Sequence, residues 1–215
     1  MTTPLKIDFV SDVSCPWCVV GLRALDQALA ALGDEVRAQI HFQPFELNPD
    51  MPGEGQDIVE HIAEKYGSSP EQIAANQQNI RARGAELGFT FAGGERRIYN
   101  TFDAHRLLHW GGLEGRQQAL KEALFAAYFT DLKDPSDHRT LAAIAQRVGL
   151  DRMRAEEILN SSDFAVEVRA AEQLWVSRGV TSVPTIVFND QYAVSGGQPV
   201  DVFIGAIRQI IGESA

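Results

Sequence analysis

Apolar and polar residues alternate in two short stretches near the N-terminus, as they do in half-buried β-strands. Residues 5–11 form the first stretch, and residues 38–45 form the second, in which Pro44 suits an edge strand or the end of a strand. Between them, from about residue 16, the sequence favours a helix. The chain is therefore predicted to open with a β-α-β unit.

The middle of the chain, from about Gln56 to Arg178, follows a helical period almost throughout. Helices are predicted to begin near residues 68–71, 134–137 and 161–163, where Ser, Asp and Pro cluster. They are predicted to end at glycines 67, 88, 111, 112, 149 and 179. This block is expected to be all-helical.

Strand character returns at residues 185–189, which are predicted to pair with residues 192–195 through a turn at Asp190-Gln191. A final helix begins at Pro199. The order β-α-β, helices, β-β-α is obtained when a small α/β domain is split by a helical insertion. We therefore predict an α/β fold with a discontinuous domain, residues 1–55 and 179–215, and an insertion, residues 56–178.

The composition is that of an ordinary globular chain, with 215 residues, 45% hydrophobic and 22% charged. Nineteen Lys and Arg stand against 29 Asp and Glu, and the net charge of −10 disfavours binding to nucleic acid or to an anionic membrane surface. The N-terminal residues show no signal-peptide pattern, and no apolar stretch approaches the length of a membrane span. A cytoplasmic location is expected.

The chain has two cysteines, Cys15 and Cys18, where the first strand passes into the first helix. Pro16 suits the first helical position, which places Cys15 at the helix N-terminus. Free backbone N–H groups and the helix dipole favour a thiolate there. Cys15 is therefore predicted to be an exposed, nucleophilic thiol.

Cys18 continues into an apolar series at spacings of four and three residues, Cys18, Leu22, Leu25, Leu29 and Leu32. These residues share one helix face, so Cys18 is predicted to point into the protein. An attacking thiol beside a sheltered one is what exchange through a mixed disulfide requires. A structural disulfide and half of a zinc site are the alternatives, and both are less favoured in a reducing cytosol with no further cysteine.

Far along the chain, Pro184 stands directly before the strand at residue 185. A cis Val183-Pro184 bond is chemically feasible, because proline is the residue with an appreciable cis population. A trans proline that opens the strand is the other interpretation.

Several motifs occur in a fixed order: Cys-Pro-Trp-Cys at a helix start, the helical block, then residues 179–185 leading to residues 195–199. This set resembles the DsbA-type thioredoxin-fold family, and within it the cytosolic FrnE-like branch. Residues 100–107 and 127–129 resemble that branch as well. The resemblance covers nearly the whole chain and implies a thioredoxin-like fold. The second cysteine pair of some FrnE-like proteins is absent from this sequence.

The resemblance implies catalytic roles for Cys15 as nucleophile, Cys18 as resolving thiol and Pro184 as the cis-proline that faces them. Such a proline holds the substrate backbone and keeps metal away from the thiols. His105 belongs by resemblance to the part of the insertion that faces the active site. We expect Trp17, Val183 and His105 to contact substrate.

Other polar residues have two interpretations each. Asp12 either transfers protons during exchange or fixes the turn. Arg96 and Arg97 either hold an anionic substrate such as glutathione or are solvated. His105 and His109 share a helix face, but no third ligand is recognisable nearby, so no metal is expected.

The leading prediction is a dithiol-disulfide oxidoreductase or isomerase that acts on disulfides of proteins or small molecules. The alternative is a glutathione-dependent isomerase or transferase, of the 2-hydroxychromene-2-carboxylate isomerase or kappa-class type. Those relatives typically have serine at the nucleophile position, so the intact cysteine pair favours the oxidoreductase. A binding module is a third interpretation. We expect no resident cofactor, with glutathione as a candidate co-substrate; oligomeric state and redox partner are left open.

Overall fold

The computed structural model describes residues 2–213. Nine α-helices, six strands and two short irregular helices, η1 and η2, are found in this part of the chain. In chain order they are β1 (Thr3–Ser11), α1 (Pro16–Leu32), η1 (Gly33–Glu35), β2 (Val36–Pro44), β3 (Gln56–Asp57), α2 (Ile58–Tyr66), α3 (Pro70–Glu86), β4 (Arg97–Ile98), α4 (Phe102–Leu113), α5 (Gln117–Phe125), η2 (Ala126–Thr130), α6 (His138–Arg147), α7 (Arg152–Leu159), α8 (Ala165–Ser177), β5 (Thr185–Phe188), β6 (Tyr192–Ser195) and α9 (Val200–Glu213).

The main sheet has four strands in the order β2-β1-β5-β6. β1 pairs in parallel with β2 and antiparallel with β5, so the central strand joins the two ends of the chain. The predicted edge strand with a terminal proline is confirmed, because β2 lies at the edge and ends at Pro44. The predicted turn is displaced by one residue: Asn189 and Asp190 have positive φ, and the Gln191 N–H donates to the Phe188 carbonyl.

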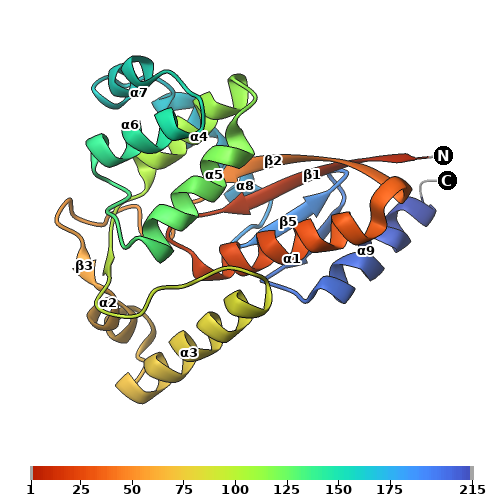
Figure 1. The fold of residues 1–215 in the computed structure, drawn as a ribbon, viewed down its shortest axis with the longest axis horizontal. Coiled ribbons are helices and arrows are strands. Elements are labelled where there is room, and N and C mark those ends of the chain that lie inside the picture. Colours follow the sequence, from red (N-terminus) through yellow and green to blue (C-terminus); the bar gives the residue numbers. More distant parts are fainter. Residues whose placement is uncertain (1, 214–215) are drawn as a thin grey trace.

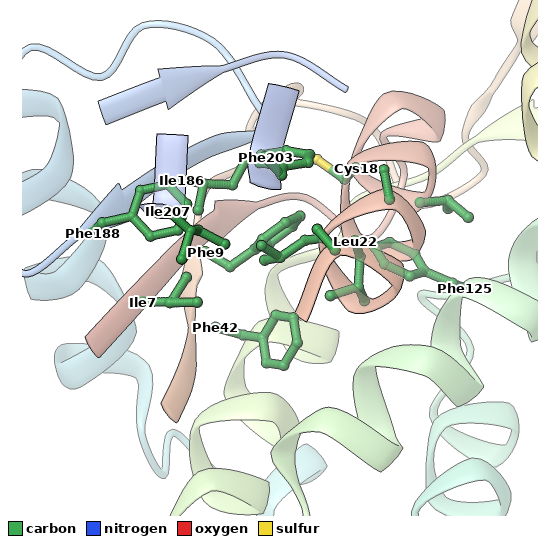
Figure 2. Packing of buried hydrophobic residues seen from close by; sticks show 14 of the residues in the cluster. Ile7, Phe9, Cys18, Leu22, Phe42, Phe125, Ile186, Phe188, Phe203 and Ile207 are labelled. Carbon is green, nitrogen blue, oxygen red and sulfur yellow. The ribbon is translucent and has the colours of Figure 1, made fainter. Parts of the chain in front are cut away.

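Helices cover both faces of this sheet (Figure 1). On one face α1 and α9 lie side by side, and the alternating β1 residues Leu5, Ile7 and Phe9 pack beneath them. On the other face Trp175 of α8 packs against Val10 of β1. Figure 2 shows how Phe9 and its neighbours fill the larger core. The α/β fold with strands from both ends of the chain is thus confirmed.

Helices α2 to α8 lie between β2 and β5 in the sequence, and α4 to α7 have an apolar core of their own. The expectation of an all-helical insertion is wrong in one detail, because β3 and β4 form a two-residue antiparallel pair. The Arg97 side chain donates to the carbonyls of Glu54 and Gly55 and so holds this pair together. Two-residue strands are too short to give an alternation signal.

Several helix starts follow the predicted chemistry, since Ser69 forms a capping box on α3 and Asp137 accepts from the Thr140 N–H of α6. α8 departs from it: Phe164, with positive φ, precedes the helix, and no side-chain cap is present. The glycines at 111 and 112 do not end a helix either. They lie inside α4, where Gln117 packs against both.

None of the helices in residues 2–213 has both the length and the apolar character that a membrane crossing requires.

Candidate active site

Cys15 is the residue that caps the N-terminus of α1. Its backbone is extended, with φ −90° and ψ 112°, and Pro16 occupies the first helical position as predicted. The Cys18 N–H donates to the Cys15 carbonyl at 3.1 Å, which closes the first turn. Both cysteines are free thiols. The helix N-terminus therefore carries a reduced dithiol.

The expectation of an exposed Cys15 thiol is wrong, because only 3% of the residue is exposed. The sulfur donates a hydrogen bond to the Val183 carbonyl, with Sγ and O 3.5 Å apart. The chain that precedes β5 therefore lies against the sulfur, a contact between residues 168 apart that no local pattern reveals.

Cys18 points into the core, as the apolar series predicted. It is fully buried and packs in the cluster that includes Phe9, Leu22 and Phe203 (Figure 2). Burial raises the pKa of the Cys18 thiol well above its ordinary value, and the neighbouring Cys15 raises it further. Cys18 is thus protonated in the resting protein, and a thiolate forms there only if a nearby group stabilises its negative charge.

The Val183-Pro184 peptide bond is cis, which decides between the two interpretations that the sequence left open. Pro184 is buried against α1 at Gly21, where an added Cβ would lie 3.1 Å from the proline Cγ. Gly21 costs helix stability, and its lack of a side chain lets the proline approach the helix. The structure thus brings Cys15 and Pro184, which were predicted to be catalytic, together with Val183, which was predicted to contact substrate.

Trp17 lies half-buried between the two cysteines. A Cβ on Gly197 would meet the Trp17 carbonyl at 3.1 Å and the indole at 3.3 Å. The indole therefore packs partly on the loop between β6 and α9. The predicted role of Trp17 and Val183 in substrate contact stays a prediction.

Asp12 is a buried carboxylate in the turn between β1 and α1. It accepts from the Ser14 N–H at 3.2 Å, the Ser14 hydroxyl at 3.0 Å and the Leu47 N–H at 2.7 Å. Burial alone would raise the pKa of Asp12, but His105, the Leu47 N–H and the Thr101 hydroxyl lower it to about 2. A group that stays ionised in this way fixes the turn, which favours the second of the two predicted roles.

His105 of α4 is buried beside Asp12. Its Nε2 is 3.5 Å from an Asp12 oxygen, without the alignment of a hydrogen bond. This placement suits support of the active-site turn better than contact with a substrate, and the substrate role stays a prediction. His109 instead stacks on Phe164, and residues 2–213 contain no group of three metal-ligating side chains.

Lys121 of α5 is the residue of this region that the sequence did not point to. Its side chain is fully buried, and within residues 2–213 its Nζ has no hydrogen-bond partner. Nζ lies 4.9 Å from the centre of the Phe125 ring. Burial lowers the pKa of Lys121 to about 8, while Cys18, Asp12 and Cys15 act to raise it. A cation thus lies in the interior close to the dithiol.

Arg96 and Arg97 have different surroundings. Arg96 lies over the rings of Tyr128 and Phe129, at 5.1 and 4.9 Å, and lines a small cavity of about 40 Å³ that Pro16 also lines. Arg97 is engaged in holding β3 to β4. Of the two arginines, only Arg96 is placed beside the cysteine motif.

A four-stranded mixed sheet with a Cys-x-x-Cys helix start, a cis-proline loop against it and a helical insertion defines a thioredoxin-fold protein of the dithiol type. The chain belongs to the family of the DSBA-like thioredoxin domain, whose model matches residues 6–208. This is the family that the sequence motifs indicated.

Similar proteins agree with this assignment. The chain is 35% identical to a probable DsbA oxidoreductase from Streptomyces coelicolor, with 97% of this chain and 91% of that chain covered and a TM-score of 0.92. It is 26% identical over 208 residues to the uncharacterized protein YwbO of Bacillus subtilis, over 96% of each. A 2-hydroxychromene-2-carboxylate isomerase shares the fold, with 17% identity over 97% of both chains and a TM-score of 0.73.

Proposed function

We propose that the protein is a thiol-disulfide oxidoreductase whose working group is the dithiol Cys15-Cys18. The Cys15 thiolate attacks a substrate disulfide, forms a mixed disulfide and releases one substrate thiol. Cys18 then attacks the Cys15 sulfur, which closes the protein disulfide and releases the second substrate thiol. In the reverse direction the same steps oxidise a dithiol substrate.

The observation that carries the proposal is the position of Cys15. Its sulfur lies at the helix N-terminus and within 3.5 Å of the Val183 carbonyl, which precedes the cis-proline. An extended substrate segment that binds alongside Val183 would therefore present its sulfur near Cys15. Membership of the DSBA-like family supports the same chemistry.

Two single variants test the assignment of roles. Cys18→Ser should accumulate mixed disulfides, because the nucleophile is present and nothing resolves the intermediate, whereas Cys15→Ser should show no exchange. Insulin reduction and mass spectrometry of trapped adducts report both outcomes. Faster alkylation of Cys18 than of Cys15 in the reduced protein would overturn the assignment.

The proposed substrates are disulfides of proteins or small molecules, and the proposed location is the cytoplasm. Two cysteines in a chain of this length suit a compartment where structural disulfides do not persist. Insulin reduction and refolding of scrambled disulfides, run in parallel, separate reductase from isomerase activity.

A glutathione-dependent isomerase or transferase is the second candidate. It is favoured by the cationic Arg96 beside Pro16, which suits a small anionic thiol, and by the fold shared with the isomerase named above. This candidate would be favoured if the protein binds glutathione, does not turn over disulfides, and has an isomerase or transferase activity that Cys18→Ser retains. Loss of exchange in that variant favours the dithiol mechanism.

A further inference from the structure

Lys121 stands out among the buried polar groups because its charge is not balanced by a hydrogen-bonded partner in the part of the chain described. Burying an ammonium costs several kcal/mol unless it is paired, so an unpaired one that is retained calls for an explanation. The nearby polar groups, Asp12 and His105, already contact each other. The packing around Lys121 suggests what the charge acts on.

The residues that flank Lys121 on α5 pack against the two parts of the active site. Leu120 and Leu124 lie in one cluster with Val13 of the turn between β1 and α1. Phe125, whose ring lies 4.9 Å from the lysine Nζ, belongs to the same cluster as Cys15 and Cys18. α5 thus packs against the active-site turn and against the apolar cluster that contains the buried thiol.

We propose that Lys121 is a positioning residue for the second half of the exchange, in which its ammonium stabilises the Cys18 thiolate that attacks the mixed disulfide. This inference rests on the proposed function. In that step Cys18 loses its proton and gives an electron pair to the Cys15 sulfur. The bond between Cys15 and the substrate sulfur breaks, and the substrate leaves as a thiolate that takes up a proton.

The electrostatics agree with this role. Burial raises the pKa of Cys18, and Lys121 is the neighbouring side-chain charge that lowers it. Asp12 is ionised and close to Lys121, which keeps the lysine charged near neutral pH. Because burial lowers the pKa of Lys121 to about 8, its support for the thiolate is present below that pH and is lost as the pH rises through it.

Titratable groups on the elements that pack beside α5 include three histidines. His41 of β2 and His105 and His109 of α4 line, together with Lys121, a cavity of about 470 Å³ between the sheet edge and α4 and α5. Any charge that these imidazoles carry is positive and opposes the lysine charge. The pH profile is measured from pH 7 upward, across the range in which Lys121 loses its proton.

Reaction with the disulfide of dithiobis-nitrobenzoate separates the two half-reactions. Cys15 releases one thionitrobenzoate when it attacks the reagent, and Cys18 releases a second when it resolves the adduct. Stopped-flow absorbance gives both rates, and Cys18→Ser should show the first release alone. If the wild-type protein gives no second release, the proposed function itself fails, whatever Lys121 does.

Lys121→Met should slow the second release about tenfold or more at pH 7, with the first release within about twofold of wild type. The rate of the second release in Lys121→Met, plotted against pH, should rise at a higher pH than in wild type. Lys121→Arg keeps the charge and should restore most of the rate, and the exposed Lys133→Met is the matched control, with no change expected.

Stability distinguishes this role from a merely structural one. Replacing an unpaired buried charge with an apolar side chain of similar length is expected to preserve or raise the unfolding temperature. An unchanged second release and pH profile in Lys121→Met would overturn the proposal. So would a slowing that Lys121→Arg fails to restore. Lys121→Gln provides a second uncharged variant if the methionine variant folds poorly.

Discussion

Asp12→Asn removes the charge of the buried carboxylate while its size stays the same. The pKa of Asp12 falls from an ordinary value of 3.8 to about 2 in the folded protein. Since each pKa unit is worth about 1.36 kcal/mol, the ionised group contributes about 2 kcal/mol at pH 7. This contribution is fully present above pH 3.8 and is lost as the pH falls through about 2.

The hydrogen bonds of Asp12 account for part of this loss. One carboxylate oxygen accepts from the Ser14 N–H and the other from the Leu47 N–H. An asparagine has one acceptor oxygen, so its amide group would face one of these N–H donors. A buried donor without an acceptor costs about 1–3 kcal/mol, and because the Leu47 hydrogen bond is already one cause of the lowered pKa, the expected total loss for Asp12→Asn is about 2–3 kcal/mol.

Urea unfolding of the reduced protein, followed by tryptophan fluorescence, measures this loss. The difference between wild type and Asp12→Asn should shrink by about 1 kcal/mol between pH 7 and pH 3, because only wild type gains a proton at this site on unfolding. Asp34→Asn, at an exposed position in η1, should change stability by less than about 0.5 kcal/mol. The proposed role of the ionised Asp12 in stabilising the turn would be refuted if Asp12→Asn lowers the free energy of unfolding by less than about 1 kcal/mol at pH 7. It would also be refuted if the difference from wild type does not depend on pH.

Two further predictions concern packing. Arg106→Met should lower stability by about 3 kcal/mol or more, because the buried guanidinium donates to the carbonyls of Asp163 and Ser161 at 2.8 and 2.7 Å. Chemical unfolding measures this loss, and Arg139→Met, at an exposed position, is the control. Gly21→Ala should slow insulin reduction several-fold, since the new Cβ lies 3.1 Å from Pro184, with little change in stability because overpacking offsets the gain in helix propensity. Gly205→Ala on α9, where the added Cβ meets open space, should leave this activity unchanged. Equal rates of insulin reduction in wild type, Gly21→Ala and Gly205→Ala would contradict the packing argument.

Features with a local cause were predictable from the sequence. The positions of β1 and β2 follow from alternation and from the proline at the end of β2, and those of β5 and β6 follow from strand-forming residues on either side of a short turn. The inward direction of Cys18 follows from helical spacing, and the helix N-terminus at Cys15 follows from Pro16. Each of these depends on a few neighbouring residues, whose chemistry the sequence displays directly.

Features with a distant cause were not predictable in this way. Cys15 is covered by Val183, and Lys121 is buried because α5 packs on the active-site turn. Within its own segment Lys121 stands next to Glu122 and resembles an ordinary solvated helix residue. The signal that finds it is the burial of its side chain together with the lack of a hydrogen-bond partner among residues 2–213.

The separation of 168 residues between Cys15 and Val183 also has a consequence for synthesis of the chain. At about 5–20 residues per second, a ribosome makes the dithiol about 8–34 s before it makes the segment that covers it. For that time β1 has no β5 beside it, and the Cys15 sulfur has no Val183 carbonyl to bind. The growing polypeptide therefore carries the Cys15 thiol without the cover that the folded protein gives it, until the segment before β5 has been made.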